Sequence, residues 1–260
     1  MFNLQGNPTG KIELPEIFEE QLRPDIIKRA VLALQSQKRQ PYGSDPLAGL
    51  RTSAHYHGKR RKRFTMMNIG RSRLPRLHAT SPHLLYRVRR VPRAVKGRRA
   101  HPPKVEKIWS QKINKKEEKL ALRSAIAATA NKEIVKARGH KIDGIKQIPL
   151  VVNDKIQSIK KTKEVEKILK KLGLEKELER SRVKKVRAGK GKLRGRKYKR
   201  KYGPLILVSE DKGVLKAGSN IPGVNVCDIK NVSVEDLAPG ALPGRLTIYS
   251  KSAVEQLRGF

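Results

Sequence analysis

Sixty consecutive residues, from Pro46 to Val105, contain 17 lysines and arginines and no aspartate or glutamate; Asp45 and Glu106 lie immediately outside them. Prolines and glycines recur throughout the stretch, so long helices are not expected in it. A segment of this length without regular structure is rare in a compact domain unless it is functional or disordered. We expect residues 46–105 to form an extended cationic internal loop, disordered in the free protein and ordered on its partner.

A second cationic segment, assigned to residues 182–203, holds 12 lysines and arginines and no acid between Arg182 and Tyr202. The rest of the chain has 32 lysines and arginines against all 23 acids, which is an ordinary basic balance. A solvated charged helix face would intersperse acids as i,i+4 partners, and neither segment does so. The net charge of +38 opposes compaction and indicates a polyanionic partner, nucleic acid before anionic membrane.

Composition excludes several other classes of protein. No run approaches the roughly 18 apolar residues of a membrane-spanning helix, and the first residues lack the pattern of a signal peptide. With one cysteine, Cys227, the chain forms no internal disulfide or thiolate cluster, and that residue is expected in the core of an apolar strand. The protein is expected to be soluble and cytoplasmic, with no membrane partner.

Residues 1–45 and 106–260 are expected to form a single α/β domain, with a mostly parallel sheet and helices on both faces. Strands alternate with helices along this part of the chain, and the two cationic segments interrupt it. The expected strands are a short hairpin of 2–4 with 11–14, then 148–152, 205–208, 224–229 and 246–249. The expected helices begin near Arg23–Asp25, span 116–138 ending at Gly139, run from Thr162 to a stop at Gly173, follow a capping box at Ser233–Asp236, and span 251–257.

The two cationic segments supply the predicted RNA-binding residues. Arginine dominates in the first segment, which favours bidentate phosphate contacts over diffuse lysine charge. The predicted contacts in the first segment are Arg51, His55, His57, Lys59, Arg60, Arg61, Lys62, Arg63, Arg87, Arg89, Arg90, Arg93, Lys96, Arg98, Arg99 and His101. Those in the second are Lys184, Lys185, Arg187, Lys190, Lys192, Arg194, Arg196, Lys197, Lys199, Arg200 and Lys201.

Five of the six histidines lie in the first segment. They lack i,i+4 helical spacing and have no carboxylate nearby, so no metal is predicted, and no other cofactor. Histidine stacking on unpaired bases or donating to phosphate is the preferred interpretation. Aromatic residues make up only 4% of the chain, so a stacking platform for single strands is not the main mode of binding. Trp109 is expected to pack on the sheet or on the helix that follows it.

Catalytic motifs are weak. The run Arg187–Lys192 looks like a phosphate-binding loop, but no Gly-x-x-x-x-Gly-Lys-Ser/Thr occurs, and no Gly-x-Gly-x-x-Gly follows a strand. Asp154, Glu210 and Asp211 follow strands without a histidine or serine in an obvious constellation. The chain is expected not to be an enzyme. Two alternatives stay open: an enzyme that modifies or cleaves RNA with the basic segments as clamps, and a nucleoid protein that binds duplex DNA.

Several motifs, in order over nearly the whole chain, carry a resemblance to a known family. They are Arg23-Pro24-Asp25-Ile26-Ile27, Leu47-Ala48-Gly49-Leu50-Arg51-Thr52-Ser53-Ala54, Gly97-Arg98-Arg99-Ala100-His101-Pro102-Pro103, Pro149-Leu150-Val151-Val152, Lys160-Lys161-Thr162-Lys163-Glu164, Arg187-Ala188-Gly189-Lys190-Gly191-Lys192, Asn220-Ile221-Pro222-Gly223 and Leu237-Ala238-Pro239-Gly240. Together they resemble large-subunit ribosomal protein four in its archaeal and eukaryotic form. The compact length, without an extended C-terminal tail, favours the archaeal branch.

The resemblance implies a structural constituent of the large ribosomal subunit that binds ribosomal RNA and contacts neighbouring ribosomal proteins. It also implies a globular domain on the subunit surface and an internal loop that reaches the nascent-peptide exit tunnel. Gly70–Arg76 is similar to the family's segment near the loop tip, so Arg71, Arg73 and Arg76 are expected near the tunnel and the nascent peptide. The chain departs from the pattern at Leu77–Thr80, where the family commonly has a glycine run, and at the very basic Lys59–Arg63.

Overall fold

The structure is a computed structural model that describes residues 1–259, and it divides into two compact units. The globular unit comprises Met1–Lys38 and the chain from Ser110 onward, and the loop unit comprises Arg39–Trp109. Each unit is described by itself below. No helix among the described residues is long and apolar enough to cross a bilayer.

The globular unit contains the helices and the strand ladders. The α-helices are α1 (Pro24–Gln37), α2 (Lys115–Ala130), α3 (Lys132–Ala137), α4 (Thr162–Lys171), α5 (Glu175–Arg182), α6 (Val214–Ser219), α7 (Val234–Leu237) and α8 (Lys251–Gln256). The strands are β1 (Leu150–Val152), β2 (Lys185–Val186), β3 (Tyr198–Lys199), β4 (Leu205–Val208), β5 (Asn225–Asp228) and β6 (Thr247–Ser250). Short 3-10 helices include η1 (Glu16–Glu19) and η3 (Lys190–Arg194).

Four strands form the central sheet in the order β1-β6-β4-β5, and every pair in it is parallel. Leu207 of β4 lies opposite Tyr249 of β6 on one side and Cys227 of β5 on the other. Parallel strands need crossover connections, and helices supply them here. The prediction of a mostly parallel sheet is confirmed.

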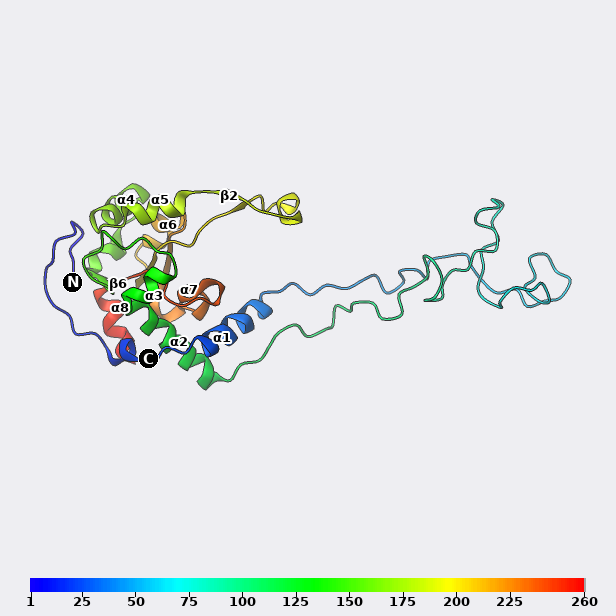
Figure 1. Ribbon diagram of the computed structural model, residues 1–260, viewed down its shortest axis with the longest axis horizontal. Coiled ribbons are helices and arrows are strands. Elements are labelled where there is room, and N and C mark those ends of the chain that lie inside the picture. The colour runs from blue at the N-terminus through cyan, green and yellow to red at the C-terminus, as the bar shows by residue number, and fades with distance from the viewer. Residues whose placement is uncertain (260) are drawn as a thin grey trace. The chain divides into compact units, whose positions relative to one another are not determined.

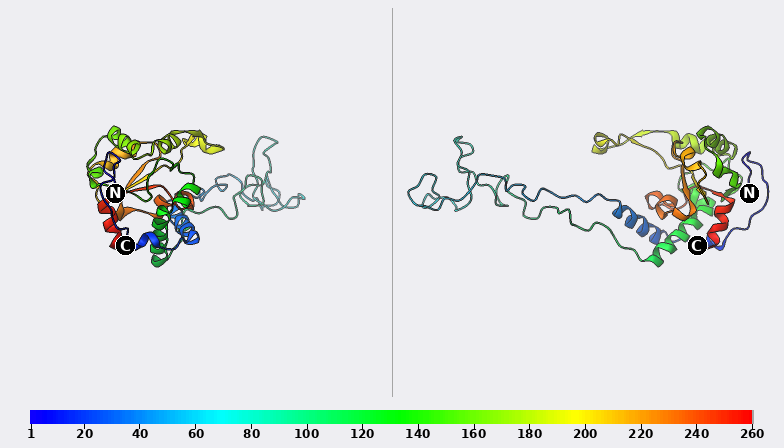
Figure 2. Two further views of the ribbon diagram at one scale, coloured as in Figure 1. Left: turned by 60° about the vertical axis from the view of Figure 1, so that its left-hand side comes forward. Right: turned by 180° about the vertical axis from the view of Figure 1, so that it is seen from behind.

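Side chains on β4 alternate between two apolar clusters, because successive residues of a strand point to opposite faces. Ile206 and Val208 pack with residues of α4, α5 and α6, whereas Leu205 and Leu207 pack with residues of η1, α1, α2, α7 and α8. Figures 1 and 2 show these helices on opposite sides of the sheet. The three layers confirm the prediction of helices on both faces.

Two predicted elements are wrong in their pairing or extent. Residues 2–4 do not pair with 11–14: Phe2 bridges Pro8, and on its other side it extends the sheet beside Val152. The helix predicted over 116–138 is divided at Asn131, whose backbone is extended and whose side chain accepts hydrogen bonds from Glu133 and Ile134 as the N-cap of α3. Long-range pairing overrode the local turn signal in the first case, and capping chemistry ended the helix in the second.

Helices α5 and α6 were not predicted. The α5 sequence is dominated by charged residues, so its apolar periodicity is weak. For α6, the polar run Glu210–Gly213 leads directly into a helix whose start is held by Asp211, which accepts from the amides of Gly213 and Leu215. The capping box at Ser233 and Asp236 is confirmed, with reciprocal hydrogen bonds at the start of α7.

In the loop unit an outgoing and a returning run of chain contact each other at several points. All of residues 39–109 are described, and none lies in a helix or a continuous strand ladder. Ser44 donates its amide to the Pro103 carbonyl at 3.0 Å. Gly49 has a positive φ, and a Cβ there would lie 2.6 Å from the Cα of Arg98, so glycine is required by both conformation and space.

Candidate nucleic-acid interface

The predicted contact residues of both segments present their charge to solvent. In the loop unit all of them are exposed except the half-buried His57 and Arg89, and in the second segment all are exposed except the half-buried Arg187. Among the described residues, the one predicted contact that forms an ion pair is Arg51, 2.9 Å from Asp45. Nearly all of this charge is therefore free to meet phosphate.

The densest charge in the loop unit is Lys59–Arg63, five consecutive bases on a tight turn. The turn closes where the Met66 amide donates to the His57 carbonyl at 3.0 Å, and Met66 itself is buried. All five basic side chains are exposed. The backbone at this position folds on itself while the charged groups point outward, which is the arrangement expected for phosphate contacts.

The three arginines predicted at the loop tip differ in what they contact. Arg71 and Arg73 are exposed, and the Arg71 guanidinium lies 4.7 Å from the Tyr86 ring centroid. Arg76 is half-buried, and its guanidinium donates to the Ser72 Oγ at 2.8 Å and to the Tyr86 carbonyl at 2.9 Å. Arg76 thus ties together two parts of the loop unit, whereas the other two are free to bind a partner.

The backbone of Arg76 reinforces this role. It forms an antiparallel bridge with His55 on one side and with Val88 on the other. The Arg76 amide donates to the His55 carbonyl at 3.0 Å, and the Leu77 amide donates to the Arg87 carbonyl at 2.9 Å. Three runs of the loop unit therefore meet at Arg76.

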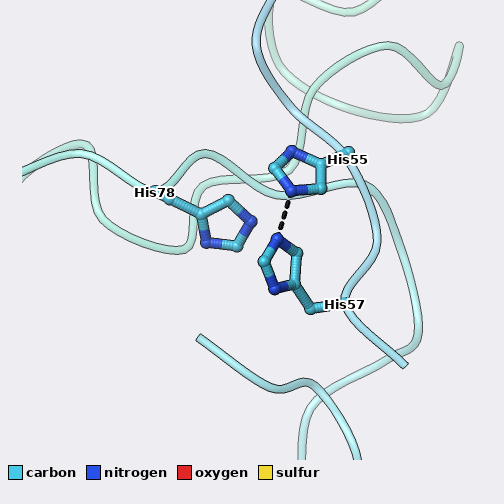
Figure 3. A group of neighbouring side chains, drawn as sticks. All are labelled: His55, His57 and His78. Carbon is cyan, nitrogen blue, oxygen red and sulfur yellow. Dashed lines mark hydrogen bonds between the residues drawn. The ribbon is translucent and has the colours of Figure 1, made fainter. Parts of the chain in front are cut away.

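Three histidines of the loop unit converge next to this crossing. The rings of His55, His57 and His78 have centroids 4.2–4.6 Å apart, and Figure 3 shows all three facing one another. Phe64 packs on His78, with centroids 4.8 Å apart. Burial lowers the pKa of His78, with a smaller contribution from the two other histidines. Sequence spacing did not reveal this cluster because two histidines come from one run and the third from another.

An aromatic and cationic cluster lies at the ends of the loop unit. Trp109 stacks on Tyr42 with ring centroids 5.2 Å apart, and the Arg39 guanidinium lies 4.0 Å from the Trp109 ring. The prediction that Trp109 packs on the sheet or on the following helix is wrong, because Tyr42 and Arg39 cover its ring instead. A groove of about 670 Å³ beside it is lined by Arg99, His101, Lys104 and Lys107, among others.

The second cationic segment forms a small hairpin, named here the basic hairpin (residues 183–201). β2 and β3 pair antiparallel, with Lys185 opposite Lys199, and η3 forms the turn. The Arg187 side chain donates to the Arg196 carbonyl at 2.9 Å, which explains its lower exposure. The run resembling a phosphate-binding loop lies in this hairpin and not after a strand of the parallel sheet, so it is not a nucleotide-binding loop.

The root of the basic hairpin is held by buried charges of the globular unit. Arg180 donates to Glu177 at 2.6 and 2.8 Å and to the Tyr202 carbonyl at 2.6 Å. His140 lies 2.7 Å from Glu177. Burial opposes ionisation of Glu177, but hydrogen bonds from Arg180, His140 and the Lys141 amide outweigh it and lower its pKa to about 2. Burial lowers the pKa of His140.

Arg245 holds the same root from the other side. It is 1% exposed and donates to the carbonyls of Gly203 and Asp236 at 2.9 Å and to the Asn225 side chain at 2.6 Å. Burial lowers the pKa of Arg245 to about 10, so it stays charged at neutral pH. Sequence reasoning missed this residue, because a single arginine beside a strand carries no signal of burial.

The acids that follow strands serve structure. Asp154 accepts from the Ser252 amide and hydroxyl at 2.9 and 2.7 Å, and Asp211 caps α6. Glu210 lies 3.9 Å from Lys212. Cys227, expected in the core, is only half-buried and packs against the apolar cluster that contains Leu207; burial raises its thiol pKa to about 11.

Comparison with known proteins gives a consistent result. Residues 12–260 match the model of the family described as "Ribosomal protein L4/L1 family". Three similar relatives are each named "Large ribosomal subunit protein uL4": those of Nanoarchaeum equitans (52% identity), Archaeoglobus fulgidus (49%) and Methanosphaera stadtmanae (48%). Each alignment covers 99% of this chain and 95–96% of the relative.

Proposed function

We propose, from the premise that this chain belongs to the ribosomal protein L4/L1 family, that it is a structural constituent of the archaeal large ribosomal subunit. It acts in the cytoplasm as part of the ribosome and is not an enzyme. Its RNA partner is the large-subunit ribosomal RNA, and its protein partners are neighbouring ribosomal proteins. These statements follow the names of relatives that it matches over nearly its whole length.

The main evidence for the binding mode is that the exposed lysines and arginines have almost no acidic partners. The loop unit and the basic hairpin expose bases that have almost no acidic partner in the structure. Lysine and arginine that neutralise phosphates release condensed counterions, which supplies most of the affinity for a nucleic-acid backbone. We therefore assign RNA binding to the predicted residues of both segments, with phosphate contacts dominant.

The alternative of an RNA-modifying or RNA-cleaving enzyme requires a reactive group among the described residues of the sheet. Asp154 and Asp211 are instead engaged in hydrogen bonds to backbone amides, and the Cys227 thiol has a raised pKa. The nucleoid alternative requires no particular RNA and predicts equal affinity for duplex DNA. Both are less well supported than the ribosomal assignment.

The loop tip carries the finer part of the proposal. Arg71 and Arg73 are exposed and make no ion pair in the described structure, so they are the groups of the tip that can face the nascent peptide in the exit tunnel. Arg76 is occupied by Ser72 and Tyr86 and supports the tip from within the loop unit. The proposed tunnel contact therefore rests on two arginines rather than three.

The test measures salt-dependent binding to large-subunit ribosomal RNA. Changing Lys59–Arg63 to glutamine should reduce the slope of log affinity against log salt by roughly 3–5, because each lost phosphate contact reduces it by about one. The matched control changes five exposed lysines of the globular unit, Lys155, Lys160, Lys161, Lys163 and Lys167, and should reduce it by less than about one.

Equal losses in the two variants would contradict the assignment of binding to the loop unit. Sedimentation tests the ribosomal role separately. The full chain should travel one-to-one with large subunits in high salt. Comigration with chromosomal DNA, or equal affinity for duplex DNA, would favour the nucleoid alternative instead.

A further inference from the structure

Three imidazoles of the loop unit lie close together although no acidic side chain lies beside them in the described structure. His55, His57 and His78 each offer one ring nitrogen, and these three nitrogens lie within 4.8 Å of one another. His55 and His57 are two residues apart in an extended run, so the pleat places them on one face. His78 comes from the run that pairs with it through the bridge between His55 and Arg76. Figure 3 shows the three rings around a common point.

The hydrogen bonds around His55 select its tautomer. Its Nδ1 lies 2.9 Å from the Ser53 carbonyl, which can only accept, so Nδ1 carries the proton. The lone pair is then on Nε2, the atom that faces His57 Nε2. A backbone carbonyl that holds one ring nitrogen and leaves the other free is the usual outer contact of a metal-binding histidine.

His78 supplies a second, independent observation. Both of its ring nitrogens are shielded from solvent and have no hydrogen-bond partner among the described residues. A buried polar group without a partner destabilises the fold, so the position of His78 calls for a ligand. Phe64 packs against the ring on one side, with ring centroids 4.8 Å apart.

We propose that His55, His57 and His78 bind one Zn²⁺ ion. Zinc prefers imidazole nitrogen at about 2.0–2.1 Å in a tetrahedron, which places ligand nitrogens roughly 3.3 Å apart. The three nitrogens lie within 4.8 Å of one another, and ligation of one ion requires side-chain rotations that separate the Nε2 atoms of His55 and His57. The fourth position is open to water. The stretch from Pro46 to Val105 contains no acid that competes for the ion.

The ion would act as a staple in a unit that has little core. Ala54 and Met66 are its only apolar side chains that are buried among the described residues. A metal bound by His55, His57 and His78 would link the two ends of the segment that contains the basic turn, Lys59–Arg63, and the loop tip, Gly70–Arg76. Small units that cannot bury enough apolar surface commonly gain stability from such a metal. The site needs no RNA, so it stands whether or not the proposed RNA contacts are correct.

The experiment uses the full chain, stripped of metal with a chelator and titrated with Zn²⁺ alone against a chromophoric competitor. One equivalent should bind, and His78→Ala should weaken binding at least ~100-fold by removing one of three ligands. His78→Cys restores a ligand and should recover most of the affinity. His83→Ala and His101→Ala, in the same loop unit but outside the cluster, should bind like the parent chain.

Three further measurements separate a built site from loss of fold and from another metal. The thermal transition of the globular unit should be the same in every variant, and Zn²⁺ should slow amide exchange over residues 55–78 in the parent but not in His78→Ala. Metal analysis of protein prepared without added metal should find zinc rather than nickel or copper. Absence of stoichiometric binding, or equal binding by His78→Ala, would overturn the proposal.

Discussion

The loop unit and the basic hairpin both present lysine and arginine without acidic partners, but they are held in place by different kinds of contact. In the loop unit the ties are internal: backbone bridges at Arg76, the guanidinium of that residue, and the histidine cluster. The root of the basic hairpin is held by charged side chains of the globular unit, the buried Glu177 and Arg245 and the half-buried Arg180.

This difference indicates how cationic segments of different length can be kept ordered. A short hairpin takes its order from the domain next to its ends, because fixing Tyr202 and Gly203 fixes most of its course. A segment of about seventy residues cannot be ordered from its ends alone, so it needs ties along its length. Removing the contacts at the root of the hairpin should therefore disturb the globular unit, whereas removing the loop unit should not.

Excision of most of the loop unit, Asp45–Pro102, is expected to have the largest effect on binding and little effect on folding. Replacing Asp45–Pro102 with a short Gly/Ser link joins ends that are hydrogen-bonded in the structure, Ser44 to Pro103. Both apolar clusters are built from the globular unit, so its cooperative thermal transition should persist. If on the order of 8 phosphates are engaged in all, affinity falls roughly 10⁴-fold between 50 and 200 mM salt for the parent and roughly 100-fold for the excised chain.

Calorimetry and salt titration check the two halves of this expectation separately. Loss of the cooperative transition would show that the loop unit belongs to the core of the domain. An unchanged salt slope would show that the basic hairpin, not the loop unit, carries the binding.

Removal of Arg245 should have a large effect on folding, in contrast to removal of the loop. Arg245→Met leaves the Gly203 carbonyl, the Asp236 carbonyl and the Asn225 side chain without their buried donor. The free energy of unfolding should fall by about 3 kcal/mol, the magnitude typical of a broken buried polar network. Arg258→Met, which removes an exposed arginine, should change it by less than about 0.5 kcal/mol, as surface substitutions do.

Urea denaturation at pH 7 measures both variants. A small effect for Arg245→Met would mean that the hairpin root is ordered by Arg180 and Glu177 without its help. The hairpin root would then be held by one polar cluster, that of Glu177 and Arg180, rather than by two.

The fold was predictable where burial is encoded in short apolar runs. Leu205–Val208 is buried on both faces and could be recognised as a central parallel strand from its composition alone. α5 could not be recognised, because two of its three buried residues, Glu177 and Ser181, are polar and form hydrogen bonds to residues distant in sequence. The same long-range pairing decided the partner of Phe2.

The candidate interface was predictable as a region but not in its detail. The absence of acids marks both segments, and the structure exposes nearly all of their predicted bases. The absence of acids did not distinguish Arg76, which holds the loop unit together, from Arg73, because both arginines lie in the same acid-free stretch and each precedes a leucine. The aromatic cluster of Tyr42 and Trp109 and the convergence of His57 with His78 also depend on which runs of the loop unit meet.

Acid should destabilise the hairpin root. Glu177 has a pKa of about 2 in the folded protein against an ordinary value of 4.5, so the stability it contributes is present above pH 4.5 and is lost as pH falls toward 2. The loss amounts to about 3 kcal/mol for this buried carboxyl. His140 also has a lowered pKa, so its contribution declines as pH falls below 6.5. Glu177→Gln should be less stable at pH 7 and should lose less additional stability between pH 4.5 and 2.

Chemical denaturation at a series of pH values measures this dependence. The excised chain without the loop unit should show the same profile as the parent, because both groups belong to the globular unit. A profile that flattens on excision would place the acid-sensitive groups in the loop unit and would contradict the contrast between the two regions.

Arg76→Lys should have the smallest effect and tests whether the loop unit is tied from within. Lysine keeps the charge but loses the forked donors that reach Ser72 and Tyr86 together. Loss of about 1 kcal/mol of local stability should speed amide exchange at Leu77 and Tyr86 by roughly fivefold. Arg73→Lys, three residues away and exposed, should leave both rates unchanged. RNA affinity should change less than about threefold in either variant, because the number of positive charges is the same. If Arg76 is instead a phosphate anchor, the exchange rates stay constant and the affinity falls more for Arg76→Lys than for Arg73→Lys, since a bidentate contact is lost. That result would make the loop unit, like the hairpin, a segment ordered from outside itself.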